Sequence, residues 1–250
     1  MMLKLMTLVK ASPTFDHAGF RDYWAGRYLP SILAAPEARG IVRIVHNHAV
    51  PLHIRDDDQI SEGGWAGVSE TWFQNRTDAD AFLASSHVHA AEASHAQMMP
   101  EISHLLCSEL PTWDHGLERA SVKMIAFFLP SATMTREQSQ HYWTHEHVRV
   151  GTTLNDPTPY APRYVQNHTL PDFHAEKPEY DFAGAPELWF KSEEAARRMF
   201  FEAKNLDLLA EDEAKFSDRS TTVMLVTDEQ EVYVKEQSAS ATPAEIERLA

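Results

Sequence analysis

A histidine at the end of an aromatic motif is the first residue in this sequence that could do chemistry. The motif reads Tyr142-Trp143-Thr144-His145-Glu146-His147. Residues four apart share a face of a helix, so His147 lies on the same face as Trp143. Imidazole exchanges protons near neutral pH, which makes His147 a candidate general acid or base. The alternative is a histidine near the end of a helix, satisfied by backbone carbonyls or solvent.

A second histidine follows in a segment that has the composition of a β-strand. Side chains alternate along a strand, so His168 shares a face with Gln166, and His46 shares the matching face of an earlier strand with His48. We expect His168 to be catalytic and Gln166 and His48 to bind substrate. The alternative is a polar residue at a strand end that is hydrogen-bonded and inert.

Two glutamates each precede a tryptophan by two residues. Glu187 shares a strand face with Trp189, and Glu70 shares one with Trp72. A carboxylate beside an indole can be desolvated, which raises its pKa and suits it to proton transfer. We therefore expect Glu187 to be catalytic and Glu70 and Trp189 to bind substrate. The alternative for these glutamates is an ion pair at an interface or a carboxylate at a rim.

The elements that position these residues follow one order twice. Apolar and β-branched runs alternate with helical spacing in the order β-α-β-β-α-β, the ferredoxin-like pattern. In the first half the strands are expected at 3–9, 41–50, 65–73 and 102–107. In the second half they are expected at 122–129, 160–170, 187–190 and 223–226. Thr135 and Gln138 form a capping box for the helix that carries His147.

Three motifs recur at nearly constant spacing, which indicates a tandem duplication. The second copy of each begins 119, 120 and 117 residues after the first, at Tyr23 and Tyr142, Arg43 and Arg163, and Glu70 and Glu187. We therefore expect a first repeat over residues 1–110, a connector over 111–118, a second repeat over 119–235 and a tail over 236–250. Repeat 1 has Tyr28 where repeat 2 has His147.

The recurring pieces resemble the EthD family of the dimeric α+β barrel superfamily. They are a first strand, the helix motif Tyr-Trp followed by histidine, a Val-x-Asn-His strand and a Glu-x-Trp-Phe strand, and they extend over nearly the whole chain. The resemblance implies an α+β fold in which two ferredoxin-like βαββαβ repeats pair into a barrel, here within one chain. It also implies a pocket between each sheet and its first helix, and makes His147 a candidate in that pocket.

The helix aromatics have two interpretations. Tyr142 and Trp143 are expected to line the pocket, with Tyr28 at the matching place in repeat 1, because small-molecule sites are largely apolar. The alternative, which the spacing favours, is that Tyr142 and Trp143 belong to the core between helix and sheet.

Other candidates for chemistry are weak. His87 and His89 are two apart on a helix and point away from each other, so no metal site is expected there. The chain has nine glycines and lacks a phosphate-binding loop, which argues against a nucleotide.

Composition narrows the class of protein. The chain has 250 residues, of which 43% are hydrophobic, and a formal net charge of −15. That charge argues against nucleic acid and against an anionic membrane surface as partners. The sequence lacks a membrane span and has one cysteine, so a cytoplasmic protein is expected. A homodimer is compatible with these observations.

Three functions are compatible with this sequence. The first is an enzyme without a cofactor, in which His147, helped by His168 or Glu187, moves protons on a small apolar or aromatic oxygenated substrate. Lyase, dehydratase and isomerase reactions of catabolic or secondary-metabolite pathways are of this type. The second is a haem enzyme of the same superfamily with a histidine as axial ligand. The third is a non-catalytic protein that binds a small molecule.

Overall fold

The computed structural model describes residues 2–50, 60–61, 64–117, 120, 122–154 and 156–235. The strands are β1 (Leu3–Lys10), β2 (Ile41–Ala49), β3 (Ile60–Ser61), β4 (Gly67–Phe73), β5 (Glu101–Asp114), β6 (Val122–Pro130), β7 (Arg163–Thr169), β8 (Gly184–Phe190) and β9 (Ser217–Val234). The α-helices are α1 (His17–Tyr23), α2 (Leu29–Leu33), α3 (Arg76–Leu83), α4 (Ser86–His95), α5 (Arg136–Tyr142), α6 (Val148–Leu154), α7 (Glu193–Arg197) and α8 (Leu206–Phe216). The tail expected over 236–250 lies outside these residues.

Shorter helical turns connect several of these elements. Three are π-helical, namely η1 (Trp24–Tyr28), η3 (Trp143–His147) and η5 (Arg198–Glu202). Two are 3₁₀ turns, namely η2 (Pro36–Gly40) and η4 (Pro178–Tyr180). The predicted capping box of Thr135 and Gln138 is present at the start of α5. Among the described residues, no helix is long and apolar enough to cross a membrane.

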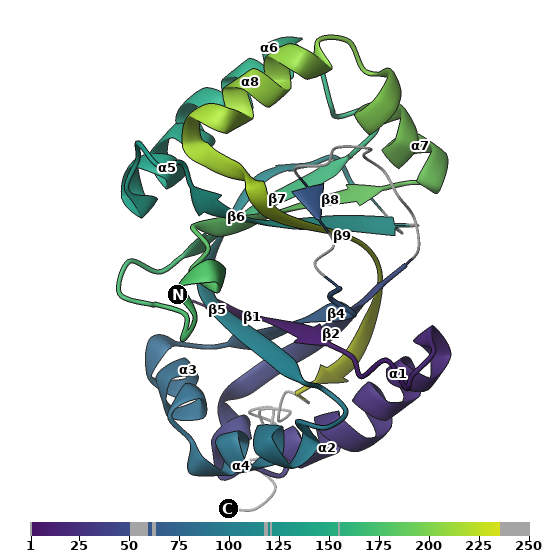
Figure 1. Cartoon of the computed structure of the whole chain (residues 1–250), viewed down its shortest axis with the longest axis vertical. Helices are drawn as coiled ribbons and strands as arrows, with labels where there is room; N and C mark the ends of the chain where they lie inside the picture. The colour runs from purple at the N-terminus through teal and green to yellow at the C-terminus, as the bar shows by residue number, and fades with distance from the viewer. Residues whose placement is uncertain are drawn as a thin grey trace, which may run out of the picture.

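Each half of the chain forms a four-stranded antiparallel sheet in ferredoxin-like order. The order is β2-β4-β1-β5 in the first half and β7-β8-β6-β9 in the second. β5 pairs with β7 and β9 pairs with β2, so the two sheets close into one barrel. Figure 1 shows α1 to α4 outside one sheet and α5 to α8 outside the other. The predicted α+β fold, with two ferredoxin-like repeats forming a barrel within one chain, is confirmed.

Two long strands join the halves. Residues 101–107 of β5 pair with β1 of their own repeat, whereas residues 107–114 pair with β7 of the other. In the same way, β9 pairs first with β6 and then with β2. The expected strands at 102–107 and 223–226 are therefore too short, and the expected connector over 111–118 begins inside β5. Pairing across the barrel extends these strands beyond the apolar runs that revealed them.

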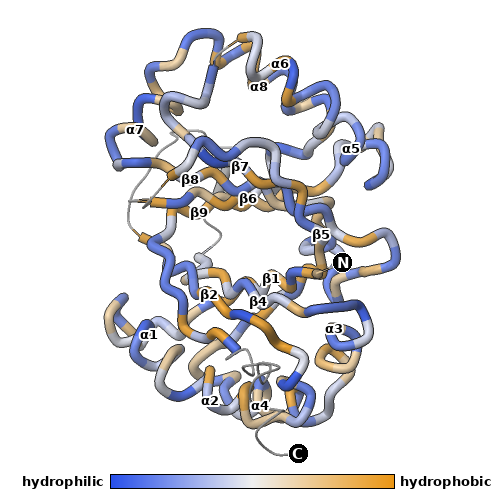
Figure 2. Tube along the Cα trace, turned by 180° about the vertical axis from the view of Figure 1, so that it is seen from behind, coloured by the Kyte–Doolittle hydropathy of each residue, from blue (hydrophilic) through white to orange (hydrophobic). Residues whose placement is uncertain are grey.

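Three apolar clusters hold the fold together. One lies between the first sheet and its helices, one between the second sheet and its helices, and one fills part of the barrel interior. Figure 2 shows the hydrophobic colour concentrated along the strands and the hydrophilic colour at the outer turns of the helices. Each strand of the barrel therefore has one face toward helices and one toward the interior, and a residue's face decides which of these regions it enters.

Candidate functional site

A close approach of helix and strand fixes the position of Trp143. The indole is 1% exposed, and a Cβ atom at Gly184 of β8 would come within 2.9 Å of its Cζ3 atom. Glycine at this point leaves room for the ring, and Gly67 faces Trp24 in the same way in repeat 1. The helix therefore packs close to the sheet at Trp143 in both repeats.

A cavity of about 160 Å³ lies between the second sheet and its helices. Trp143 and His147 line it, together with largely apolar residues from several elements, including Met124, Phe128, Leu188, Met199, Phe200 and Phe216. An apolar cavity of about 150 Å³ accommodates benzene. The cavity is therefore suited to a small molecule of about the size of one aromatic ring.

His147 is paired with a buried aspartate from α8. Its Nδ1 atom lies 2.9 Å from Oδ2 of Asp212, whose other oxygen accepts hydrogen bonds from the Tyr142 hydroxyl at 2.7 Å and the Lys215 ammonium at 3.0 Å. Burial alone would raise the pKa of Asp212, but the hydrogen bonds from His147, Tyr142 and Lys215 hold it well below its usual range. The ionised carboxylate accepts the Nδ1 proton, which leaves Nε2 of a neutral imidazole as the basic nitrogen.

A chain of hydrogen bonds beside Trp143 ends at a tyrosine of the cavity wall. Nε2 of His168 lies 3.0 Å from Oε1 of Gln166, whose amide nitrogen donates to the Tyr164 hydroxyl at 3.2 Å. The indole N–H of Trp143 donates to the same hydroxyl at 2.8 Å. Burial lowers the pKa of His168 to about 4, so the ring is neutral near pH 7 and its N–H donates to the amide oxygen.

His168 and Gln166 are not among the residues that line this cavity. His168 stacks on Trp143 with ring centroids 4.8 Å apart, on the side that the sheet covers. The expectation that His168 and Gln166 touch substrate is therefore not met by the cavity as it stands. They are connected to the cavity through their contacts with Tyr164 and Trp143.

Glu187 faces the barrel interior, away from the cavity. Its strand neighbours Pro186 and Leu188 line the cavity, and alternation along β8 places Glu187 on the opposite face. There it forms a closed ring with Lys4, Glu70 and Lys123. Each carboxylate contacts both ammonium groups, at 2.9 and 2.8 Å for Glu187 and at 3.1 and 2.8 Å for Glu70.

In this ring Glu187 has the contacts expected of the alternative, an ion pair at an interface. Burial and the neighbouring Glu70 carboxylate raise the pKa of Glu187 to about 7, against the opposing effect of the two lysines. Trp189 belongs to the same interior. Its ring lies between Lys123 and Arg163, with cation-to-centroid distances of 4.5 and 4.3 Å.

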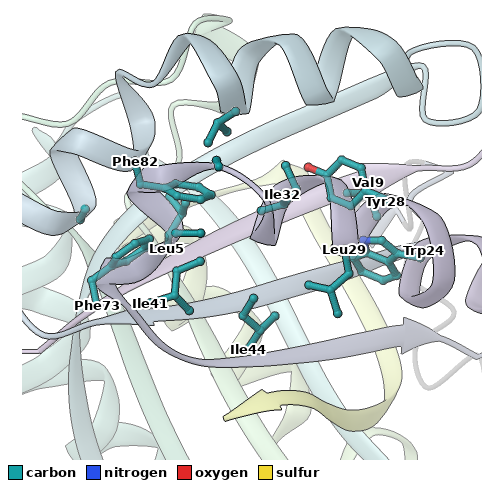
Figure 3. Packing of buried hydrophobic residues seen from close by; sticks show 14 of the residues in the cluster. Leu5, Val9, Trp24, Tyr28, Leu29, Ile32, Ile41, Ile44, Phe73 and Phe82 are labelled. Carbon is teal, nitrogen blue, oxygen red and sulfur yellow. The ribbon is translucent and has the colours of Figure 1, made fainter. Parts of the chain in front are cut away.

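Repeat 1 has core residues where repeat 2 has the cavity. Tyr28, at the position of His147, is 7% exposed, and burial together with Glu92 raises the pKa of its hydroxyl well above the usual value. Ile32 stands where repeat 2 has Gly151 and is also buried. Figure 3 shows both residues in the packed cluster around Trp24. Tyr28 therefore belongs to the core of repeat 1 and is not among the residues that line the cavity.

His48 is not among the residues that line the cavity of repeat 2 either. Its ring meets the edge of Trp24 at 5.3 Å, and neither ring nitrogen has a hydrogen-bond partner within the part of the chain that the structure describes. Burial, with Arg21 and His17 nearby, lowers its pKa to about 4.

Sequence reasoning missed two residues of the site. Asp212 lies in an acidic run of α8 that reads as a solvated helix face, and only the fold turns it toward His147. Its counterpart by contact in repeat 1 is His95, which hydrogen-bonds Tyr23 as Asp212 bonds Tyr142. Tyr164 could have been found, because the aligned strand motifs differ there, with Ile44 in repeat 1.

The cavity does not fit a haem group. Pockets that enclose drug-sized ligands measure roughly 300–1,000 Å³, well above the volume found here. Among the described residues, no group of three or more His, Cys, Asp or Glu side chains is placed to hold a metal ion.

The closed barrel of two ferredoxin-like repeats, with a pocket between one sheet and its helices, defines a protein of the dimeric α+β barrel type. A model of the EthD domain matches residues 12–100 and again residues 131–220. The chain therefore belongs to the EthD family, with the domain present twice in tandem.

Solved structures agree with this fold. An anthrone oxidase-like protein is similar with a TM-score of 0.66 and 10% identity, over 95% of this chain and 96% of that chain. A monooxygenase-like protein from Fusobacterium nucleatum has a TM-score of 0.50 and 6% identity, over 94% of each chain. At these identities the likeness concerns the fold alone. No curated protein matches this sequence.

Proposed function

We propose that this chain is a cofactor-independent enzyme that transfers a proton on a small, largely apolar organic molecule bearing oxygen, in the cavity of repeat 2. The reaction would be of the lyase, dehydratase or isomerase type. The observation that carries the proposal is the pairing of His147 with the buried, ionised Asp212 at the wall of an apolar cavity.

The roles of the residues follow from their contacts. Asp212 fixes the tautomer and the orientation of the imidazole, and stabilises the imidazolium that forms when Nε2 accepts a proton. Tyr142 and Lys215 hold Asp212 in place and keep it ionised. The apolar wall excludes water, which favours transfer between substrate and imidazole over exchange with solvent.

Exchange of carbon-bound hydrogen for deuterium tests this without knowledge of the natural substrate. Small cyclic ketones and phenolic ketones are incubated with the protein in D₂O, and loss of the proton next to the carbonyl is followed by NMR. Replacing His147 by Ala should lower the rate by roughly 10²–10⁴-fold, because general base catalysis contributes about that much. Asp212→Asn should also lower it, because the imidazole loses its orienting acceptor.

Tyr28→Phe in repeat 1 is the matched control, and we expect exchange within about twofold of the wild type. An equal loss of rate in Tyr28→Phe and His147→Ala would contradict the asymmetry between the repeats. Compounds that raise the melting temperature of the wild type but never exchange would instead favour the third function, a binding protein without catalysis.

A further inference from the structure

The Tyr164 hydroxyl accepts two hydrogen bonds, but its own hydrogen is not donated to any described residue. A hydroxyl offers two acceptor lone pairs and one donor hydrogen. Trp143 and Gln166 both donate to this oxygen, at 2.8 and 3.2 Å, and so occupy both lone pairs. None of the described residues accepts the hydroxyl hydrogen in return. Tyr164 is 6% exposed and lines the cavity, so it is largely shielded from bulk water.

The hydrogen bonds that lead to Tyr164 all donate in the same direction, from His168 toward the cavity. Neutral His168 donates to Gln166, and Gln166 donates to Tyr164, so every proton in the chain points toward the cavity wall. Each donor in such a chain polarises the next and strengthens the last hydrogen bond. Repeat 1 lacks this arrangement, since Ile44 replaces the tyrosine and the indole nitrogen of Trp24 has no partner in the part of the chain described.

We propose that Tyr164 donates its hydroxyl hydrogen bond to an oxygen of the substrate, so that the substrate is an enolisable carbonyl compound or a phenol. The inference rests on the proposed function and names its substrate class. His147 Nε2 takes the proton from the carbon next to the carbonyl. The electron pair of that C–H bond forms the new carbon–carbon double bond, and the carbonyl π electrons move to the oxygen, where Tyr164 stabilises the resulting oxyanion. Gln166, Trp143 and His168 are positioning residues that act through Tyr164.

Binding of two matched probes tests the proposal. 4-Nitrophenol and nitrobenzene have the same ring and differ by the phenolic oxygen. Above the pKa of the phenol, the wild type should bind 4-nitrophenolate about 10- to 100-fold more tightly than nitrobenzene, since a hydrogen bond to a charged group has about that effect. Tyr164→Phe should abolish most of this preference and leave nitrobenzene affinity within about twofold. The hydrogen bond from Tyr164 should shift the absorption band of bound nitrophenolate to shorter wavelength than that of the free ion, and Tyr164→Phe should remove most of this shift.

Further variants test the hydrogen bonds that lead from His168 through Gln166 to Tyr164. Gln166→Met removes one donor to Tyr164 and should reduce the preference for nitrophenolate less than Tyr164→Phe does. Tyr233→Phe, in the distant core cluster of repeat 1, should change neither affinity. If Tyr164→Phe does not fold, the ratio of the two affinities in the wild type still decides, because a ratio near one would overturn the proposal.

The outcomes distinguish this inference from the proposed function. Binding of both probes with the same preference in the wild type and in Tyr164→Phe would overturn the role of Tyr164 and leave the His147 site intact. Failure of both probes to bind the wild type would contradict the cavity as a site for small aromatic molecules, and with it both proposals.

Discussion

Single residue differences between the repeats separate a cavity from a packed core. His147 and Tyr28 occupy equivalent positions on equivalent helices, yet one lines a cavity and the other is part of the core. The difference depends on neighbours as much as on the residue itself. Gly151 leaves space that Ile32 fills in repeat 1, and Asp212 supplies an acceptor that orients the imidazole of His147.

Buried histidines make the stability of this protein sensitive to mild acid. Burial lowers the pKa of His46 to about 3 and those of His48 and His168 to about 4. The unfolded chain binds these protons near pH 6.5, whereas the folded protein does not bind them until the pH is much lower. The free energy of unfolding should therefore fall as the pH drops from about 6.5 toward 4, by up to about 1.4 kcal/mol per pH unit for each histidine.

Urea unfolding at several pH values checks this expectation. His48→Leu should flatten the decline and should also raise stability at pH 5, because it removes two buried nitrogens that have no partner among the described residues. A wild-type protein equally stable at pH 7 and pH 4.5 would show that these rings do titrate normally in the folded state.

Among the secondary-structure elements, substitutions at two glycines test how closely helix and sheet approach each other. A Cβ atom at Gly184 would lie 2.5 Å from the Asn167 carbonyl oxygen and 2.9 Å from Trp143, so Gly184→Ala should destabilise the fold by about 2–4 kcal/mol. At Gly151 the nearest atom would lie 3.8 Å away. Gly151→Ala should therefore stabilise α6 by up to about 1 kcal/mol, the helix preference for alanine over glycine.

Denaturant melts of the two variants give the comparison, and ligand affinity gives a second readout. Gly151→Ile should fill the cavity as Ile32 does in repeat 1 and abolish probe binding in a folded protein. Similar stability of Gly184→Ala and Gly151→Ala would mean that Trp143 can shift away from the strand.

Most elements were predictable from the sequence because their apolar periodicity reflects the face that they bury. The repeat revealed the barrel, and alternation along β8 paired Glu187 with Trp189 on one face. Alternation alone could not say which face points to the cavity, because both faces of a barrel strand are buried. Asp212 could not be predicted as a site residue for another reason. A carboxylate inside an acidic run looks solvated until tertiary packing brings it to His147.

At the scale of the whole molecule, the ring of Lys4, Glu70, Lys123 and Glu187 connects the two repeats. All four side chains are no more than 2% exposed, and each repeat contributes one lysine and one glutamate. Lys123→Met leaves Lys4 as the single lysine facing Glu70, Glu187 and the partly exposed Glu109, which should cost about 3–5 kcal/mol of unfolding free energy.

Replacing all four ring residues by apolar side chains of similar size should be far milder, since buried ion pairs repay little more than their desolvation. Chemical denaturation of the single and quadruple variants measures both effects. If the single variant matched the wild type, water or a proton must compensate the lost charge, and the ring would not be the connection described here.

Closure of the barrel within one chain has a consequence for how such a protein can change over time. In a symmetric homodimer, any substitution appears at two places at once, so a residue that improves one pocket must also be tolerated in the other. Here separate parts of one gene encode the two halves, so a substitution in one half leaves the other unchanged. The interior ring has a twofold pattern because both halves contribute to it, whereas the outer face of each half can differ without disturbing the other.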